Sequence, residues 1–387
     1  MAPIRPWRCP QQRKQPDCMK ILVATDAWHP QVNGVVRTLG HVSREARALG
    51  CELEFLSPDQ FRTLPMPSYP EIRLALAASS HVTRRLERSR PDAIHVATEG
   101  PIGHAMRRVC LRNDLPFTTS FHTRFPDYIA ERLPMPERWT SQVTWTWLRR
   151  FHAPGAATLA ATPTLASELT TRGFNNVKLW PRGVDAELFR PSTKASLNFS
   201  RPIFLTVGRL AVEKNLDAFL KLDLPGTKVV VGDGPARNGL ARKFLDAIFL
   251  GPHQGEALAE IYAAADVFVF PSRTDTFGLV LLEALASGVP VAAFPAAAPR
   301  DVVGNAPVGV LDEDLRLACL GALECSRQDC RDFALGMTWG ASARIFLEHV
   351  THGARSGRKP STIDAGLHVN MSAGVEHGAE VRPAGHP

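Results

Sequence analysis

Residues 266–291 read DVFVFPSRTDTFGLVLLEALASGVPV and contain three predicted elements. An apolar run at Val267–Phe270, rich in β-branched and aromatic residues, predicts a buried strand. After a polar turn, the apolar run Phe277–Ala286 predicts a helix that ends at Gly288, because glycine readily adopts the left-handed conformation that stops helices. A second strand is predicted at Pro290–Phe294. Strand, helix and strand in this order indicate a parallel α/β unit.

Two carboxylates belong to this helix region: Asp275 lies just before the helix, and Glu283 lies within it, eight positions later. A helix N-terminus presents free backbone N–H groups and the positive end of the helix dipole, which suits a phosphate. A carboxylate buried among Leu and Ala is costly unless a partner hydrogen-bonds it. A sugar nucleotide satisfies both needs, with its diphosphate at the helix start and its hydroxyls on the carboxylates.

The same alternation of strand and helix runs through both halves of the chain. The first half has predicted strands at Ile21–Ala24, Leu53–Ser57, Ala93–Val96, Phe117–Ser120 and Thr158–Ala161. We expect the strand at 158–161 to be the last of that half. The second half has predicted strands at Ile203–Val207, Lys228–Val231, Ala247–Leu250, Val267–Phe270 and Val291–Phe294. This alternation predicts parallel sheets with helices on both faces, whose ligands bind beyond the carboxyl ends of the strands.

The 266–291 stretch resembles the acidic-x7-Glu signature of the family-four retaining glycosyltransferases of GT-B fold, in which Glu is usual where this chain has Asp275. The resemblance implies an α/β protein of two Rossmann-like, doubly wound domains that face each other across a cleft. It implies that Glu283 holds the nucleotide ribose of a donor. It also implies that Asp275 and the backbone of Phe277, Gly278 and Leu279 hold the donor sugar and its phosphates.

Composition and resemblance together divide the chain. The expected parts are a disordered leader at 1–18, an N-terminal acceptor-binding Rossmann-like domain at 19–190, a C-terminal nucleotide-sugar-binding Rossmann-like domain at 200–335, a C-terminal helix at 336–352 that crosses back onto the first domain, and a disordered tail at 353–387. Residues 186–200 are the expected linker. The leader contains four prolines and no apolar core, so it is not a signal peptide, and we expect the functional chain to start at Met19.

A basic element follows strand Ile203–Val207, where Gly208 and Arg209 precede Lys214. It resembles the Gly-Arg-x4-Lys element of the family, which implies that Arg209 and Lys214 hold the diphosphate and that Gly208 lies at the donor. Glycosyl transfer expels a nucleoside diphosphate, so positive charge is needed where negative charge develops. The alternative is a surface Arg and Lys on a helix, with Glu213 as a neighbour.

The turn Gly232-Asp233-Gly234-Pro235 follows another predicted strand. It fails as a dinucleotide fingerprint, because Arg237 stands where the third glycine belongs. It resembles a Gly-Asp-Gly-Pro turn that lies near the nucleotide in the family, which makes Gly232 and Gly234 candidate donor-binding residues.

Asn33 and Gly34 form a turn between the first predicted strand and its helix, where glycine lets the backbone approach a ligand closely. The resemblance implies that this turn lies under the donor phosphates and the acceptor. The family often has two glycines here, and Asn33 tolerates positive φ in place of the first. A plain tight turn is the alternative.

His122 follows the strand Phe117–Ser120. A lone histidine after a strand is most often structural, but the resemblance implies that this one contacts the transferred sugar from the opposite domain. We do not expect it to be the general base, because in a front-face reaction the leaving phosphate oxygen takes the acceptor proton. Asp127, in the same loop, is the alternative base.

Two further segments bear on the cleft. The loop Pro295–Asp301 has Ala298 where the family commonly has a glycine near the donor, and we expect this Ala to narrow the donor pocket. Residues Arg182 to Asp185 resemble an interdomain motif of the family.

Charge and cysteine usage exclude several classes of protein. The chain has a net charge of +7, but residues 1–18 and 353–387 hold four of these charges, and no aromatic-basic module stands out, so nucleic acid is not an expected partner. The seven cysteines form no Cys-x-x-Cys pair, which favours reduced thiols in a cytoplasmic protein. We expect neither a metal nor another cofactor.

Membrane contact is a separate hypothesis. No segment reaches the roughly 18 apolar residues of a membrane helix. An aromatic and apolar series repeats every four residues at Trp139, Val143, Trp147 and Phe151. Basic residues lie beside it at Arg149 and Arg150, and in a second run at Arg84, Arg85, Arg88 and Arg90. These residues would lay the acceptor domain on the anionic inner face of a membrane, unless they are an internal helix face and a solvated charged helix.

The sequence therefore predicts a metal-independent retaining glycosyltransferase. The whole chain from Met19 to about Val350 is similar to GDP-mannose-dependent alpha-mannosyltransferases and sulfoquinovosyl-diacylglycerol synthases, which implies a hexose donor, with GDP-mannose preferred, and a lipid or glycan acceptor. The alternatives are a UDP-sugar-dependent glycolipid synthase, a non-catalytic GT-B-like module that binds a nucleotide sugar, and a nucleotide-sugar epimerase.

Overall fold

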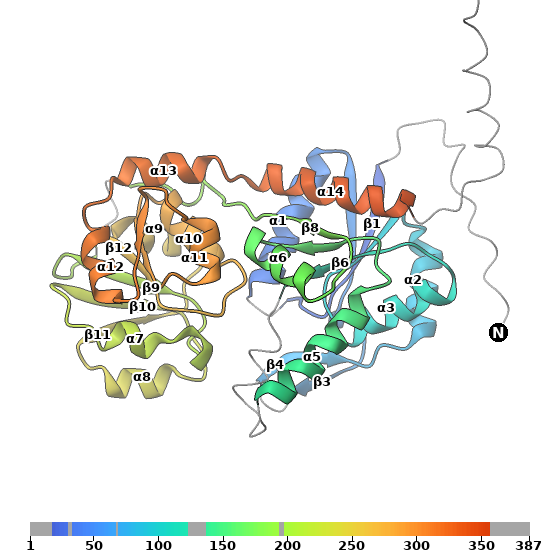
Figure 1. Cartoon of the computed structure of the whole chain (residues 1–387), viewed down its shortest axis with the longest axis horizontal. Helices are drawn as coiled ribbons and strands as arrows, with labels where there is room; N and C mark the ends of the chain where they lie inside the picture. Colours follow the sequence, from blue (N-terminus) through green and yellow to red (C-terminus); the bar gives the residue numbers. More distant parts are fainter. Residues whose placement is uncertain (1–17, 30–32, 67–68, 123–136, 193–196, 357–387) are drawn as a thin grey trace, which may run out of the picture.

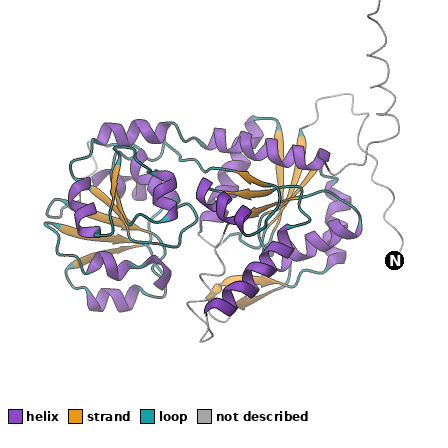
Figure 2. Cartoon of the chain, in the orientation of Figure 1, coloured by secondary structure: helices purple, strands orange, loops and turns teal. Residues whose placement is uncertain are grey.

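The computed structural model describes residues 18–29, 33–66, 69–122, 137–192 and 197–356. These residues form two units, each built on a six-stranded parallel sheet, and the two units lie side by side (Figure 1). Figure 2 shows that helices flank the strands of both units. The predicted leader, apart from residue 18, and the predicted tail beyond residue 356 lie outside the described residues.

The N-terminal sheet has the strand order β2-β1-β5-β6-β7-β8. Its strands are β1 (Met19–Ala24), β2 (Cys51–Leu56), β5 (Ala93–Val96), β6 (Thr118–Phe121), β7 (Thr158–Ala160) and β8 (Val177–Leu179). The expectation that 158–161 is the last strand of this half was wrong, because β8 pairs with β7 at the edge of the sheet. β8 has three residues, two of them exposed, so it carries little apolar pattern.

Helices and one hairpin complete this unit. The helices are α1 (Gly34–Ala48), α2 (Ser79–Ser89), α3 (Pro101–Arg112), α5 (Glu137–His152) and α6 (Pro163–Thr171), with a short 3-10 turn at Pro58–Gln60. An antiparallel hairpin of β3 (Thr63–Met66) and β4 (Tyr69–Ala75) follows β2. The sequence did not predict this hairpin, because each of its strands contains a proline, which argues against a strand.

The C-terminal sheet has the strand order β11-β10-β9-β12-β13-β14. Its strands are β9 (Ile203–Val207), β10 (Thr227–Val231), β11 (Ala247–Gly251), β12 (Val267–Phe270), β13 (Val291–Ala293) and β14 (Gly309–Leu311). Its helices are α7 (Leu216–Leu220), α8 (Arg237–Lys243), α9 (Gly255–Ala264), α10 (Leu279–Ala286), α11 (Ala297–Val302), α12 (Leu315–Ala322) and α13 (Arg327–Leu335), with a 3-10 turn at Val212–Lys214. The order reverses between β9 and β12, and doubly wound sheets bind their ligands at such a reversal.

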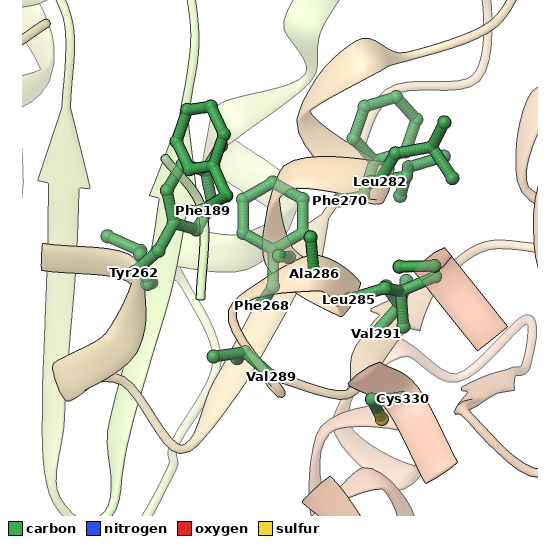
Figure 3. Close-up of a cluster of buried hydrophobic side chains, with 14 of the residues drawn as sticks. Phe189, Tyr262, Phe268, Phe270, Leu282, Leu285, Ala286, Val289, Val291 and Cys330 are labelled. Carbon is green, nitrogen blue, oxygen red and sulfur yellow. The ribbon is translucent and has the colours of Figure 1, made fainter. Parts of the chain in front are cut away.

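Helix α10 is buried between its sheet and α13. All residues from Leu281 to Ala286 are buried, which explains why the helix is apolar on every face. Figure 3 shows side chains of this core, in which Leu282 and Leu285 of α10 pack among aromatic residues that include Phe268 of β12. Burying one such side chain contributes about 1.5–3 kcal/mol. The same burial forces Glu283, which lies between these leucines, into the interior.

The chain crosses between the units twice, and the two crossings are joined. The backbone N–H of Val184 donates to the Met337 carbonyl at 3.0 Å, and Val184 forms a parallel bridge with Thr338. Helix α14 (Trp339–Ser356) then lies along the N-terminal unit (Figure 1). Its Phe346 and Val350 belong to the hydrophobic core of that unit. The predicted helix that crosses back is therefore present, and it runs four residues beyond the expected end at 352.

We predict that His95 makes stability depend on pH. The ring is fully buried on β5, and both nitrogens are hydrogen-bonded, at 2.8 Å each, to Thr118 and Ser120. Burial, together with the charges of Arg182 and His152, lowers the pKa of His95 to about 3. Because the folded pKa lies below the unfolded value of about 6.5, stability is lost as the pH falls through that range. From pH 7 to pH 5 the loss from this residue is roughly 2 kcal/mol.

Chemical denaturation of the protein and of His95→Gln at pH 7 and pH 5 measures this contribution. The variant has a lower free energy of unfolding at pH 7 than the native protein. Between pH 7 and pH 5, however, its free energy of unfolding falls by roughly 2 kcal/mol less. An equal fall in the free energy of unfolding of the two proteins would contradict the contribution assigned to His95.

Candidate active site

The first part of the site lies where the C-terminal sheet reverses its strand order. The segment after β9 ends in the 3-10 turn at Lys214, and the segment after β12 contains Asp275. The Nζ atom of Lys214 lies 2.5 Å from Oδ1 of Asp275. Arg209 instead donates to Oε1 of Glu213 at 2.7 Å, so the acidic neighbour noted in the sequence orients this guanidinium. The structure therefore brings Lys214 and Asp275 together, and Arg209 is held by the buried Glu213.

The second part of the site comes from the other unit. His122 follows β6, and its backbone carbonyl accepts a hydrogen bond of 2.9 Å from the Thr276 hydroxyl. Thr276 is the chain neighbour of Asp275, so this bond joins the two segments that carry the predicted sugar-binding residues at the boundary between the units, here called the gap. His122 Nε2 and Asp275 Oδ2 are both buried, and neither has a partner among the residues that the structure describes.

These two atoms suit a hydroxylated ligand. A buried polar atom without a partner costs about 1–3 kcal/mol, which a ligand hydroxyl recovers by bonding to it. A carboxylate oxygen only accepts, whereas a neutral imidazole nitrogen donates or accepts according to its tautomer. The gap therefore offers an acceptor on one unit and an imidazole nitrogen on the other.

Glu283 is held by two residues that the sequence did not single out. Its carboxylate accepts hydrogen bonds from Arg37 of α1, across the two units, and from the Tyr262 hydroxyl at 3.1 Å. Burial lowers the pKa of Arg37, but the charge of Glu283, the neighbouring Tyr262 and the hydrogen bond to Glu283 together outweigh it, and the net shift is upward. Burial and the Glu283 carboxylate raise the pKa of Tyr262 well above its usual value. The carboxylate predicted to bind ribose is thus already fixed between partners.

Arg37 carried no recognisable signal in the sequence. It lies 246 positions from Glu283 and next to the apolar stripe of α1, where an arginine is normally a solvated residue. A small pocket lies beside the pair, and residues of both units line it, including His41, Leu279 and Trp339.

The turn before α1 differs from the expectation for Asn33. We noted that Asn33 tolerates positive φ, but it is extended, with φ −144°, and it caps the helix instead. Its Oδ1 accepts from the backbone N–H groups of Val35 and Val36 at 3.0 Å each. A Cβ atom on Gly34 would lie 3.9 Å from Leu279, so this turn faces the start of α10.

Helix α10 begins two residues later than predicted. Gly278 occupies its N-cap with φ 78°, a left-handed conformation that excludes Phe277 from the helix. Phe277 is buried, and Leu279 starts the helix opposite the Gly34 turn. The N-terminus of α10 therefore faces the N-terminal unit, as a site for donor phosphates requires.

The predicted glycine turns lie against each other. A Cβ atom on Gly232 would come within 1.9 Å of the Gly208 carbonyl oxygen, so only glycine fits at this close approach. Gly234 likewise lies against the Leu210 backbone. These contacts hold the loop after β10 beside the loop after β9, and donor contact by Gly208, Gly232 and Gly234 stays a prediction.

The segment 295–301 is not an open loop, because residues 297–302 form α11 and Ala298 is buried in it. At the end of this helix, Asp301 accepts from the backbone N–H and the hydroxyl of Thr164 at 3.0 and 2.7 Å, a further contact between the units. Asp127, the alternative base, lies outside the described residues. Within those residues no group of three His, Cys, Asp or Glu side chains is placed to hold a metal ion.

Two family models match the chain. The model described as Glycosyltransferase Family 4 matches residues 32–188, and the model described as Glycosyl transferases group 1 matches residues 201–319. The chain is 31% identical over 319 residues to the GDP-mannose-dependent alpha-mannosyltransferase of Mycobacterium tuberculosis, a match that covers 76% of this chain and 83% of that protein. It is 33% identical over 258 residues to the sulfoquinovosyl transferase of Arabidopsis thaliana, which covers 62% of this chain and 50% of the plant protein.

Two solved structures share the fold. The sucrose-phosphate synthase of Thermosynechococcus elongatus has a TM-score of 0.68 at 18% identity, over 85% of this chain and 98% of that chain. The Anabaena HepE protein in complex with UDP has a TM-score of 0.62 at 15% identity, over 86% of this chain and 100% of that chain. At these identities the likeness concerns the fold alone, which is the GT-B arrangement of two Rossmann-like units expected from the sequence.

We predict that the Arg37–Glu283 pair couples the two units energetically. Arg37→Met leaves the Glu283 carboxylate, with a side chain 4% exposed, without its countercharge, and destabilises the protein. Adding Glu283→Gln removes that charge, so the double variant is more stable than Arg37→Met alone. Thermal denaturation of the two single variants and the double variant yields a coupling energy of about 1–3 kcal/mol.

The Arg44–Asp185 pair is the matched control, because it joins α1 to the first crossing between the units but is more exposed and 3.9 Å apart. Its coupling energy is below about 0.5 kcal/mol. Equal coupling energies in the two pairs would contradict the prediction that burial makes the Arg37–Glu283 pair the stronger link between the units.

Proposed function

This chain belongs to the family-four glycosyltransferases of GT-B fold, and from that membership we propose that it transfers a hexose, with mannose preferred, from a nucleotide-diphosphate sugar to a lipid or glycan acceptor with retention of configuration. The observation that carries the proposal concerns two buried atoms without a hydrogen-bond partner among the described residues, His122 Nε2 in one unit and Asp275 Oδ2 in the other. The Thr276–His122 hydrogen bond brings the segments of these two residues together. A sugar between them donates a hydroxyl hydrogen bond to Asp275 and bonds to the imidazole of His122.

The charged residues around this gap fit the other parts of a donor. Lys214, 2.5 Å from Asp275, supplies positive charge for the diphosphate, and the start of α10 at Gly278 supplies backbone N–H groups. A carboxylate accepts about four hydrogen bonds, and Arg37 and Tyr262 each donate to Glu283. Glu283 binds the ribose hydroxyls by accepting the remaining hydrogen bonds. Arg209, oriented by Glu213, faces the same diphosphate.

The reaction follows from these roles. The bond between the anomeric carbon and the β-phosphate oxygen breaks, a bond from the acceptor oxygen to the same carbon forms on the same face, and the acceptor proton passes to the β-phosphate. Lys214 and Arg209 stabilise the charge that develops on the diphosphate. No metal ion is needed in this scheme, because the two cations take its role.

The preference for GDP-mannose rests on the relatives. The proteins from M. tuberculosis and Mycolicibacterium smegmatis, at 31% and 32% identity, are named GDP-mannose-dependent alpha-mannosyltransferases. A lipid acceptor is supported by the name of a relative at 23% identity, the alpha-monoglucosyldiacylglycerol synthase of Acholeplasma laidlawii. The alternative of a UDP-sugar donor is supported by the UDP bound to the HepE structure.

A lipid acceptor would bring the N-terminal unit to a membrane. Val143 and Trp147 on α5 are 66% and 41% exposed, with Arg149 and Arg150 exposed beside them, whereas Phe151 is buried. In the basic run of α2, Arg85 is paired with Glu54 at 2.8 Å, and Arg84, Arg88 and Arg90 are exposed. We include in the proposal a peripheral position on the cytoplasmic, anionic face of a membrane. None of the helices within the described ranges is both long and apolar enough to span a membrane.

A donor screen tests the proposed function. The full chain is incubated with GDP- and UDP-sugars and with acceptor lipids in anionic or neutral vesicles, and nucleoside diphosphate release is measured with and without EDTA. We expect GDP release from GDP-mannose, unaffected by EDTA and faster on anionic vesicles. Lys214→Ala lowers kcat by about 100-fold or more, because the leaving group loses its cation. Lys243→Ala, which removes a lysine paired with Asp217 at the surface, leaves the rate unchanged.

The other outcomes identify the alternatives. Release of UDP alone would make the protein a UDP-sugar-dependent enzyme. Tight nucleotide binding without release from any donor would make it a binding module. A product of inverted anomeric configuration, read from its proton NMR spectrum, would overturn the retaining mechanism.

A further inference from the structure

Arg182 contacts the Nδ1 side of the His122 ring, whereas the atom of that ring without a partner among the described residues is Nε2. Arg182 is 5% exposed, it follows β8, and one of its terminal nitrogens donates to the Trp180 carbonyl at 2.6 Å. The guanidinium carbon lies 4.1 Å from the centre of the Trp180 ring, which adds a cation–π contact. The other terminal nitrogen lies 3.3 Å from Nδ1 of His122. The guanidinium is thus fixed at two points and aimed at the imidazole.

A guanidinium can only donate hydrogen bonds, and this decides the state of the ring. Nδ1 of His122 must accept from Arg182, so it carries no proton. A neutral imidazole with a bare Nδ1 carries its proton on Nε2. Nε2 is the buried atom that has no partner within the described part of the chain.

From this geometry we propose that Arg182 is a positioning residue, which holds His122 in the Nε2–H tautomer so that the imidazole presents a hydrogen-bond donor to the transferred sugar. The inference rests on the proposed function for its ligand, but the tautomer belongs to the protein alone. It also sets the polarity of the site, because the sugar must offer an acceptor oxygen to His122 and a hydroxyl proton to Asp275.

The surroundings oppose the other protonation states. Burial, followed by the charges of Arg182, His95 and His152, lowers the pKa of His122 well below its usual value, so the ring stays neutral. His95 and His152 each use both ring nitrogens, the latter on Thr119 and Glu99, and neither bonds to His122. A ring that is neutral and protonated on Nε2 cannot remove the acceptor proton, which leaves that role to the leaving phosphate.

A purely structural role is the competing explanation, because Arg182 also anchors Trp180 beside the crossing between the units. The two explanations differ in what a change at position 182 does when His122 is absent. Glutamine at position 122 carries a side-chain N–H near the place of Nε2, and its donor does not depend on a guanidinium.

The first experiment reads the tautomer directly. The full chain is labelled with ¹⁵N-histidine, and the His122 signals are assigned by their loss in His122→Gln. We expect a protonated Nε2 and an unprotonated, hydrogen-bonded Nδ1 at pH 7, without donor present. A proton on Nδ1 would overturn the proposal whatever the enzyme transfers, and this measurement needs no folded Arg182 variant.

The second experiment is a cycle of variants that measures donor turnover. In the native background, Arg182→Met lowers kcat about 10- to 100-fold and changes the donor KM less. In the His122→Gln background, the same substitution lowers kcat less than about twofold. Arg182→Lys, which retains a donor, recovers part of the loss. Arg331→Met is the control, because Arg331 also anchors backbone carbonyls, three where Arg182 anchors one, and its partners do not include His122.

Arg331→Met changes turnover by the same factor in both backgrounds, since its effect is structural. The same factor for Arg182→Met in both backgrounds would overturn the positioning role. If no donor is turned over at all, the proposed function fails, and the ¹⁵N measurement still decides the tautomer.

Discussion

A charged or strongly polar group inside a protein must have a partner of complementary character, and the cleft of this enzyme is arranged around that constraint. Glu283 sits on a helix that is buried on almost every face, and it is matched by Arg37 from the other unit. Asp275 is matched on one oxygen by Lys214, and His122 on one nitrogen by Arg182. In Asp275 and His122 the second polar atom is buried but has no partner within the described residues, and we propose that the sugar binds between these two atoms.

The sheets explain why these groups meet. Lys214 and Asp275 follow β9 and β12, the neighbouring strands at which the order of the C-terminal sheet reverses. His122 follows β6 of the other sheet, and the Thr276–His122 bond joins the two edges. The joined crossings at Val184 and Thr338, with α14 packed on the N-terminal unit, keep the two edges facing each other. The residues proposed to contact the donor sugar therefore come from both units.

Much of the fold was readable in the sequence, because strands and helices alternate in both halves and the 266–291 stretch resembles the signature of a family with two Rossmann-like domains. The start of α10 was misplaced by two residues, since a left-handed Gly278 is not visible in a pattern of apolar residues. β8 and β14 have three residues each and no full burial, so no periodicity marked them. Arg37 could not be found either, and Arg182 was noted only as part of an interdomain motif, because their contacts join residues 246 and 60 positions apart.

A crystal structure of the full chain with an unreacted nucleotide sugar is the most direct test of the central claim that the sugar lies between the two units. The account predicts the sugar within hydrogen-bond distance of His122 Nε2 and Asp275 Oδ2, the diphosphate at Lys214 and the start of α10, and the ribose at Glu283. A nucleotide bound with its sugar directed away from His122, or outside the gap between the units, would contradict it.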